Sequence, residues 1–248
     1  MQKGVRLLLM VCLLVTLGII CLQVFWLNNL YTLNKDRFEK DINLAVEDAI
    51  KKELTARNDR IERLLFNFMM DTSEIRITSK FNPKDGKQMY QALNVKDPND
   101  DHWFSHKQLH APILSQTDPY KEKVAMTLAR SLREEDLDRH IIFYRTQNIG
   151  NYLADKTEEL SFDTAKLRPF LKQSLQERNI SEHFVFSLTD ADNTLNRNHF
   201  PDSLTKLYPV ISKAFPTYRN KAGENYVRAY FLSPSNYLFS RSIGLVLG

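Results

Sequence analysis

The sequence predicts an α+β protein in which an N-terminal transmembrane helix continues into a long helix, followed by helices packed on a small antiparallel sheet. Three observations lead to this prediction. Residues 7–27 form an uncharged apolar segment. Residues 28–70 contain neither proline nor glycine and repeat apolar residues at helical spacing. From residue 183 onwards the apolar period falls to two, which is typical of strands.

The apolar segment is long enough to cross a membrane. No charged residue occurs between Leu7 and Asn34. As a helix, the 21 residues of segment 7–27 would extend roughly 31 Å, close to the thickness of the hydrocarbon core of a bilayer. Trp26 and Tyr31 follow where an interfacial aromatic belt is expected. A cleaved signal peptide is the alternative, but the length of the segment and the absence of a small-x-small cleavage site favour an uncleaved anchor.

The expected organisation has four parts. Residues 1–6 form a tail, residues 7–27 the transmembrane helix, and residues 28–241 the main domain. Basic residues flank both ends of the first apolar segment, so the positive-inside rule does not set its orientation. Residues 242–248, SIGLVLG, are apolar and follow the last charge, Arg241. They are expected to begin a second, truncated transmembrane helix, with a C-terminal strand as the alternative.

Residues 28–70 are expected to continue the membrane helix as a stalk. Their apolar residues recur every three or four positions, and charged residues occupy the opposite face. Two interpretations fit this pattern: a helix that packs on its own domain, or a signalling helix that pairs with a second copy of the chain. The stripe consists of Phe38, Ile42, Ala45, Ala49, Leu54, Ile61, Leu64 or Leu65, and Phe68.

Further elements follow the stalk. Asn179 is expected in the left-handed conformation that often ends a helix. Residues 207–215 fit either a strand or a short helix. The other expected elements are a strand at 74–81, a turn at 82–86, a short helix near 103–110, helices at 120–151 and 164–178, and strands at 183–189 and 224–232.

Composition excludes several kinds of chemistry. Both cysteines, Cys12 and Cys21, lie in the apolar segment, so the following domain has no disulfide, zinc-thiolate site or thiol nucleophile. Charged residues of both signs make up 26% of the chain. The net charge of +4 is spread along the chain without a basic block, so nucleic-acid binding is not expected.

Three histidines suggest a metal site. His102, His106 and His110 recur every four residues, just after two aspartates. On a helix the three imidazoles would share one face, and neutral imidazoles at this spacing can bind Zn²⁺ or Cu²⁺. The alternative is an exposed polar segment whose histidines bind nothing.

A group of aromatic residues belongs to the strands near the C-terminus. They are expected to form core, and the alternative is that alternate members line the ligand pocket of a PAS-like sensor sheet. The residues are Phe184, Phe186, Tyr226, Tyr230 and Phe231.

Three stretches of the chain are similar to those of a known family. Residues 23–45 run from QVFWL into FEKDINLA, residues 167–190 from LRPFLKQSLQERNI into FVFSLTD, and residues 226–238 from YVRAYF to YL. Together they resemble the input region of bacterial membrane-bound sensor histidine kinases of the two-component type. The resemblance implies that residues 28–241 are a periplasmic sensor domain between two membrane helices, and that residues 1–6 are a cytoplasmic tail. The 248 residues contain neither a phosphoacceptor histidine of the His-Glu type nor a glycine-rich nucleotide loop.

The resemblance implies that the chain is the signal-sensing and transmembrane portion of such a kinase, in the bacterial inner membrane with its main domain in the periplasm. The implied partners are membrane lipid, a second copy of the chain, an unknown periplasmic ligand, and a response regulator acting through a cytoplasmic kinase core. ATP would bind only to that core, so no catalytic or cofactor-binding residues are expected here. The alternatives are a membrane-anchored periplasmic binding or envelope protein without kinase output, and the same input domain joined to a chemoreceptor or cyclase.

Overall fold

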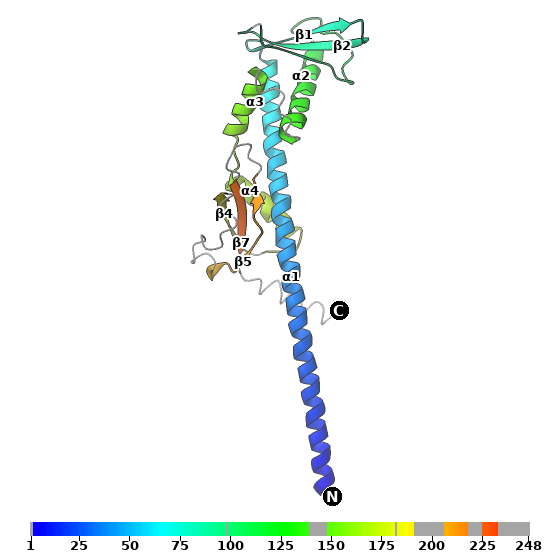
Figure 1. Cartoon of the computed structure of the whole chain (residues 1–248), viewed down its shortest axis with the longest axis vertical. Helices are drawn as coiled ribbons and strands as arrows, with labels where there is room; N and C mark the ends of the chain where they lie inside the picture. Colours follow the sequence, from blue (N-terminus) through cyan, green and yellow to red (C-terminus); the bar gives the residue numbers. More distant parts are fainter. Residues whose placement is uncertain are drawn as a thin grey trace. The chain divides into compact units, whose positions relative to one another are not determined.

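The computed structural model describes residues 2–97, 99–138, 148–181, 183–190, 206–217 and 225–232. Within these residues the protein is α+β, with a long N-terminal apolar helix, further helices and small antiparallel sheets, as predicted (Figure 1). Its elements are α1 (Gln2–Met70), β1 (Ile75–Asn82), β2 (Lys87–Asn94), β3 (Asp101–Phe104), α2 (Pro119–Leu132), the π-helical segment η1 (Arg133–Asp138), α3 (Asn148–Glu159), α4 (Thr164–Gln176), β4 (Phe184–Asp190), β5 (Val210–Ile211), β6 (Phe215–Pro216) and β7 (Asn225–Phe231).

Helix α1 is continuous from the apolar segment to the end of the expected stalk. No proline or glycine interrupts it between residues 28 and 70. The large apolar side chains from Met10 to Leu27 are 49% to 71% exposed, so the protein itself does not cover them. Among the described residues this is the one helix that is long and apolar enough to cross a membrane.

Contacts divide the chain into two compact units, and α1 contributes residues to both. The first unit consists of Met1–Lys51 and Thr164–Gly248. The second unit consists of Lys52–Asp163. Each unit contains its own small sheet, so the single sheet expected from the sequence is in fact two.

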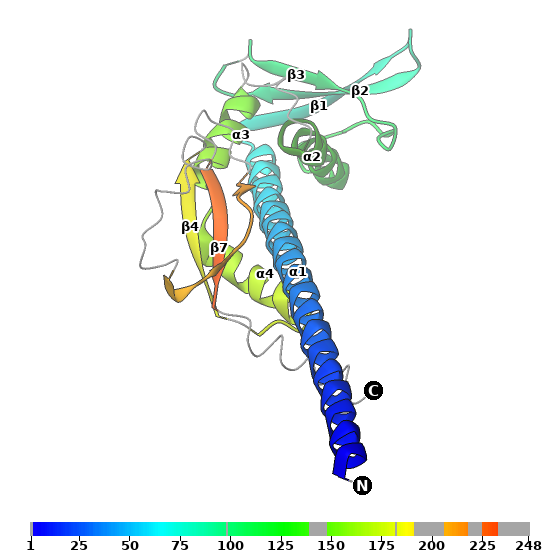
Figure 2. The same ribbon diagram turned by 60° about the horizontal axis from the view of Figure 1, so that its bottom comes forward.

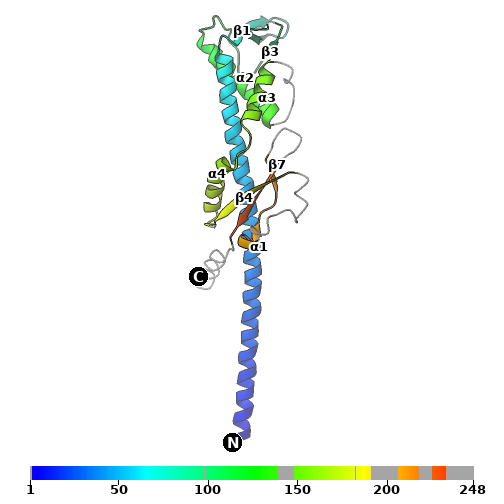
Figure 3. The same ribbon diagram turned by 90° about the vertical axis from the view of Figure 1, so that its left-hand side faces the viewer.

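The sheet of the first unit is built around β7. Strand β4 pairs antiparallel with one edge of β7, with Phe184 opposite Phe231. The short strands β5 and β6 pair with successive parts of the other edge. Figure 3 shows α4 and the pair of strands β4 and β7 beside α1. The strand expected at 224–232 is therefore the centre of this sheet.

The apolar stripe of α1 forms part of the core of the first unit. Phe38, Ile42, Ala45 and Ala49 are each completely buried. The ring of Phe38 meets the ring of Phe231 edge to face, with 6.5 Å between their centroids. This part of the stripe thus packs on its own domain, which is the first of the two interpretations of the pattern.

Helix α4 ends at Gln176 in a Schellman motif. Asn179 has a φ of 58°, the left-handed conformation expected for it. The N–H of Ile180 donates to the carbonyl of Leu175 at 2.9 Å, and the N–H of Asn179 donates to that of Gln176 at 3.0 Å. Ile180 and Leu175 occupy the positions whose apolar contact frequently accompanies such a cap, and both are buried.

The second unit contains the sheet β1–β2–β3, in which both pairings are antiparallel. The expected turn joins β1 to β2, with Gly86 at a φ of 63° and the side chain of Asn82 accepting a hydrogen bond from the N–H of Lys84. Helices α2 and α3 pack along the last turns of α1 (Figures 1 and 2). The core of this unit includes Ile61, Leu65, Met69, Ile77, Tyr90, Val124, Leu128 and Leu153.

The single helix expected at 120–151 is wrong. Helix α2 begins at Pro119, where Asp118 accepts the N–H of Tyr120 as N-cap, and ends at Leu132. It passes into the π-helical segment η1 at Arg133, and the next described helix, α3, begins at Asn148. Residues 139–147, which belong to the expected helix, lie outside the described residues.

The short helix expected near 103–110 is also wrong. Trp103 pairs with Gln91 as part of β3, and the chain then turns at residues 107–108. Strand β3 is extended because its backbone pairs with the edge of β2. This pairing overrides the local preference for a helix. The expected second membrane helix at 242–248 lies outside the described residues.

The buried face of α4 should contribute to the stability of the first unit. Leu171 is completely buried, whereas the next residue, Lys172, is exposed. Replacing Leu171 with Ala should lower the free energy of unfolding by about 2–5 kcal/mol, because it leaves a cavity in the core. Lys172→Ala should change it by less than about 0.5 kcal/mol. Thermal unfolding of the two variants in the same detergent provides the measurement, and equal transition temperatures would contradict the packing described.

Candidate functional site

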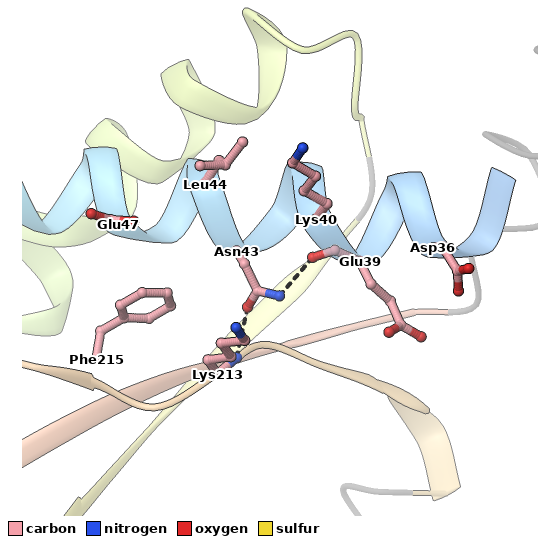
Figure 4. A pocket seen from close by; sticks show the side chains of 8 residues that line it. All are labelled: Asp36, Glu39, Lys40, Asn43, Leu44, Glu47, Lys213 and Phe215. Carbon is pink, nitrogen blue, oxygen red and sulfur yellow. Dashed lines mark hydrogen bonds between the residues drawn. The ribbon is translucent and has the colours of Figure 1, made fainter. Parts of the chain in front are cut away.

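A groove of about 410 Å³ lies in the first unit, between α1 and the segment that contains β5 and β6. Figure 4 shows that one side of α1 faces this segment across the groove. The α1 residues come from about three helical turns that begin at Asp36, nine positions after the end of the apolar segment. The lining residues are Asp36, Glu39, Lys40, Asn43, Leu44, Glu47, Lys213 and Phe215.

Asn43 joins the two sides of the groove. Its Oδ1 accepts a hydrogen bond of 2.7 Å from the backbone N–H of Lys213. Its Nδ2 donates to the carbonyl of Glu39 in α1, also at 2.7 Å. Both bonds are drawn in Figure 4. One amide therefore fixes the position of Lys213 relative to α1.

The charges of the groove are mixed. Glu47 forms a 2.7 Å ion pair with Lys51, and Glu39 approaches Lys35 at 4.0 Å. Within the part of the chain that the structure describes, Lys40 and Lys213 form no ion pair. Phe215 adds a half-buried ring.

The groups that line this groove suit the binding of a small polar molecule. Its described lining residues include no serine, cysteine or histidine. It offers ammonium groups, carboxylates, an amide and one aromatic ring. A small polar molecule that carries charge could use these groups, because charge-assisted hydrogen bonds are the strongest polar contacts available.

The histidines predicted to bind metal do not share a helical face. His102 lies on β3 with its ring stacked on that of Phe104, at 6.0 Å between centroids. His106 accepts the N–H of Gln108, and the N–H of His110 donates to the hydroxyl of Tyr120 at 2.8 Å. Among the described residues, no group of three or more His, Cys, Asp or Glu is arranged to hold a metal ion. The helix on which the metal prediction depended is absent.

A small hollow beside His102 has a structural explanation. Asp100 accepts a 2.8 Å hydrogen bond from the N–H of Asn148, the first residue of α3, and a 3.3 Å bond from the amide of Asn94. The space has no room for a water molecule. Asp100 therefore stabilises the start of α3 and does not serve an open site.

The aromatic residues near the C-terminus lie on both faces of their sheet. Phe184 and Phe186 have ring centroids 5.3 Å apart and point toward the face that carries Phe231. Tyr230 is completely buried and belongs to the opposite face by strand alternation. The guanidinium of Arg168 lies 5.4 Å from the centroid of the Phe184 ring. The five residues therefore do not surround one pocket, and Phe231 and Tyr230 belong to the core.

One charged cluster was not recognised in the sequence. Arg133, at the start of η1, forms ion pairs with Glu62 at 2.9 Å and with Asp59 at 3.0 Å. Burial would lower the pKa of Arg133, but the carboxylates of Glu62, Asp59 and Asp138 raise it above its usual value. The i, i+3 spacing of Asp59 and Glu62 places both carboxylates on one face of α1, and it is the feature of the sequence that could have indicated this cluster. The cluster fixes η1 to α1.

Comparisons with known proteins do not place the chain in a family. No family model matches the sequence. The chain is 25% identical over 158 residues to the ATP-dependent RNA helicase DeaD of Buchnera aphidicola subsp. Baizongia pistaciae (strain Bp). This match covers 63% of the chain but only 24% of the helicase. No solved structure matches. The sequence contains no GxxxxGK[ST] motif for nucleotide binding, so the similarity does not carry helicase activity to this chain.

The side-chain amide of Asn43 should hold the backbone around Lys213 in place. Asn43→Ala should speed hydrogen exchange at the backbone amide of Lys213, because its acceptor is removed, and should cost about 1 kcal/mol of stability. Asn43→Asp keeps an oxygen acceptor and should leave that amide protected. Hydrogen exchange of the whole chain, read by mass spectrometry, measures the difference. Unchanged exchange at Lys213 in the alanine variant would mean that another group holds this segment.

Proposed function

We propose that the chain is the signal-input region of a membrane-bound sensor histidine kinase of the two-component type. In this proposal the main domain is periplasmic, and two copies of the chain act together. The kinase core, its ATP and the response regulator belong to a cytoplasmic part outside these 248 residues. The single observation that best supports the proposal is the continuity of α1 from the apolar segment through the cores of both units.

The apolar part of α1 supports a membrane role. Its side chains between Met10 and Leu27 are largely exposed and would be unfavourable in water. Trp26 is 54% exposed and Tyr31 56%, as suits residues at a membrane interface. A bilayer would cover this surface without any further protein contact.

The remainder of α1 supports a role in signal transmission. Phe38 and Ile42 are buried in the first unit, and Ile61 and Leu65 are buried in the second. A change in the position of α1 must therefore alter packing in the core that surrounds it, because such cores are close-packed and do not deform continuously. A ligand that binds one packing arrangement more tightly would shift the population of α1 positions.

The groove provides a place for such a ligand. Asp36, Glu39 and Asn43 lie on α1 within the turns that follow the apolar segment. A ligand bound between these residues and Lys213 would act directly on the helix that enters the membrane. The alternative is a membrane-anchored periplasmic binding or envelope protein, which would use the same groove without a kinase output.

A periplasmic main domain can be tested with reporter fusions. Alkaline phosphatase fused after Met70 should be active in a bacterial host, because the enzyme acquires its disulfides only after export. The matched fusion with β-galactosidase should be inactive. The reverse pattern would place the domain in the cytoplasm and contradict the proposal.

Insertions in α1 test whether the helix transmits a signal. The chain would be joined to the kinase core of a two-component kinase with a transcriptional reporter. Two residues inserted between Leu33 and Asn34 rotate the following helix by about 200°, whereas seven residues return it to within about 20° of its original face. The two-residue insertion should change the basal reporter output, and the seven-residue insertion should largely preserve it.

The insertions distinguish the two candidate functions. If neither insertion changes the reporter while both proteins remain in the membrane, α1 acts only as an anchor. A binding or envelope protein without kinase output would then be the better explanation.

A further inference from the structure

The three-stranded sheet of the second unit has one face that its own helices do not cover. Strand alternation places Ile77 and Tyr90 on the inner face, where both are completely buried. The segment after β3 also contacts this inner side, through hydrogen bonds from Ile113 to Ser79 and from Tyr90 to Ala111. The intervening residues of β1, β2 and β3 point the other way and are exposed or half-buried. We call this second side the outer face.

A row of hydrogen bonds crosses the outer face. Thr78 donates to Gln91 at 3.2 Å, Gln91 donates to Asp101 at 2.6 Å, and the indole N–H of Trp103 donates to the same carboxylate oxygen at 2.7 Å. The indole is held in place and yet remains 44% exposed. An exposed large ring that is already fixed loses little conformational freedom when a ligand binds.

The outer face is also positively charged. Arg76 and Lys80 on β1 and Lys87 on β2 share this face by register and are exposed. None of the three forms an ion pair or hydrogen bond with another described residue. Asp101 is the one carboxylate among the strand residues of this face, and it already accepts two hydrogen bonds. Three cations are thus available to an anionic partner.

We propose that the outer face of this sheet binds an anionic polysaccharide. The C–H groups of a sugar ring can pack on the exposed indole of Trp103. Carboxylates or phosphates along the polymer can reach Arg76, Lys80 and Lys87. A protein partner fits less well, because protein interfaces usually have an apolar centre and here the aliphatic contribution is limited to the half-buried Met89 and Leu93.

Binding can be measured on the full chain in lipid nanodiscs. Polygalacturonate serves as the anionic polysaccharide, dextran as a neutral one, and poly-L-glutamate as a polyanion without sugar rings. Polygalacturonate should bind, and its affinity should fall as salt rises because the charges are exposed. In a Trp26→Phe background Trp103 is the remaining tryptophan of the two in the chain, so its fluorescence should change on binding.

Two variants separate the contribution of the indole of Trp103 to binding from that of the positive charges. Trp103→Ala should weaken binding of polygalacturonate about tenfold, as measured by calorimetry. The double variant Arg76→Gln with Lys80→Gln should weaken it to a similar extent and reduce the dependence on salt. Lys107→Gln is the matched control, because this exposed lysine lies in the turn after β3, outside the outer face. All replaced residues are on the surface, so the thermal transition should be unchanged.

Three results would overturn the proposal. Equal binding of poly-L-glutamate would show that charge alone attracts the ligand and would favour an acidic protein as the partner. Equal binding of a single-stranded RNA would favour a nucleic acid. Binding of polygalacturonate that Trp103→Ala and the double variant leave unchanged would place the site elsewhere on the molecule.

Discussion

Side-chain packing against one helix, α1, is the interaction on which the rest of the structure depends. In the first unit, α1 contributes Phe38 and Ile42 to a core completed by α4 and the sheet around β7. In the second unit, it contributes Ile61 and Leu65 to a core completed by α2, α3 and the sheet β1–β2–β3. Neither sheet is large enough to form a domain without such a partner, because a sheet of three or four short strands must bury one face against another layer.

The two candidate binding surfaces differ in the way in which they are held in place. The groove beside α1 depends on one long-range hydrogen bond, between the amide of Asn43 and the backbone of Lys213. The outer face of the three-stranded sheet depends on a row of side chains on regular strands, which ends at Trp103. Sites on regular strands are more precisely positioned than sites on short irregular segments, and the latter adapt more readily to a ligand. The groove is therefore suited to changing its shape when a ligand binds. The outer face of the sheet is suited to holding a ligand without such a change.

Periodic and local features could be predicted from the sequence. The apolar stripe of α1, the strands that became β1, β4 and β7, and the left-handed Asn179 each depend on residues close together in the chain. Features that require distant residues could not be predicted. Arg133, directly after the end of α2, forms an ion pair with Glu62, 71 positions earlier in the chain. No proline or glycine in the sequence marks the end of this helix. The groove joins residues 170 positions apart. The regular spacing of the histidines suggested a helix, but pairing with β2 made the segment extended.

The continuity of α1 has a consequence for biosynthesis. If the apolar segment spans a membrane, as proposed, no change of secondary structure tells the insertion machinery where that segment ends, because the same helix continues into the folded units. The amino-acid composition of α1 must therefore mark the end of the apolar segment. Charged residues begin at Lys35 and recur along the stalk as far as Arg63, and each charge at the centre of a bilayer opposes insertion by about 2.5–3.5 kcal/mol. The polar residues buried on the stalk, such as Glu53 and Glu62, add to this barrier before the domain has folded around them. In the proposed anchor, the charge pattern would thus limit how much of one uninterrupted helix a bilayer can accept.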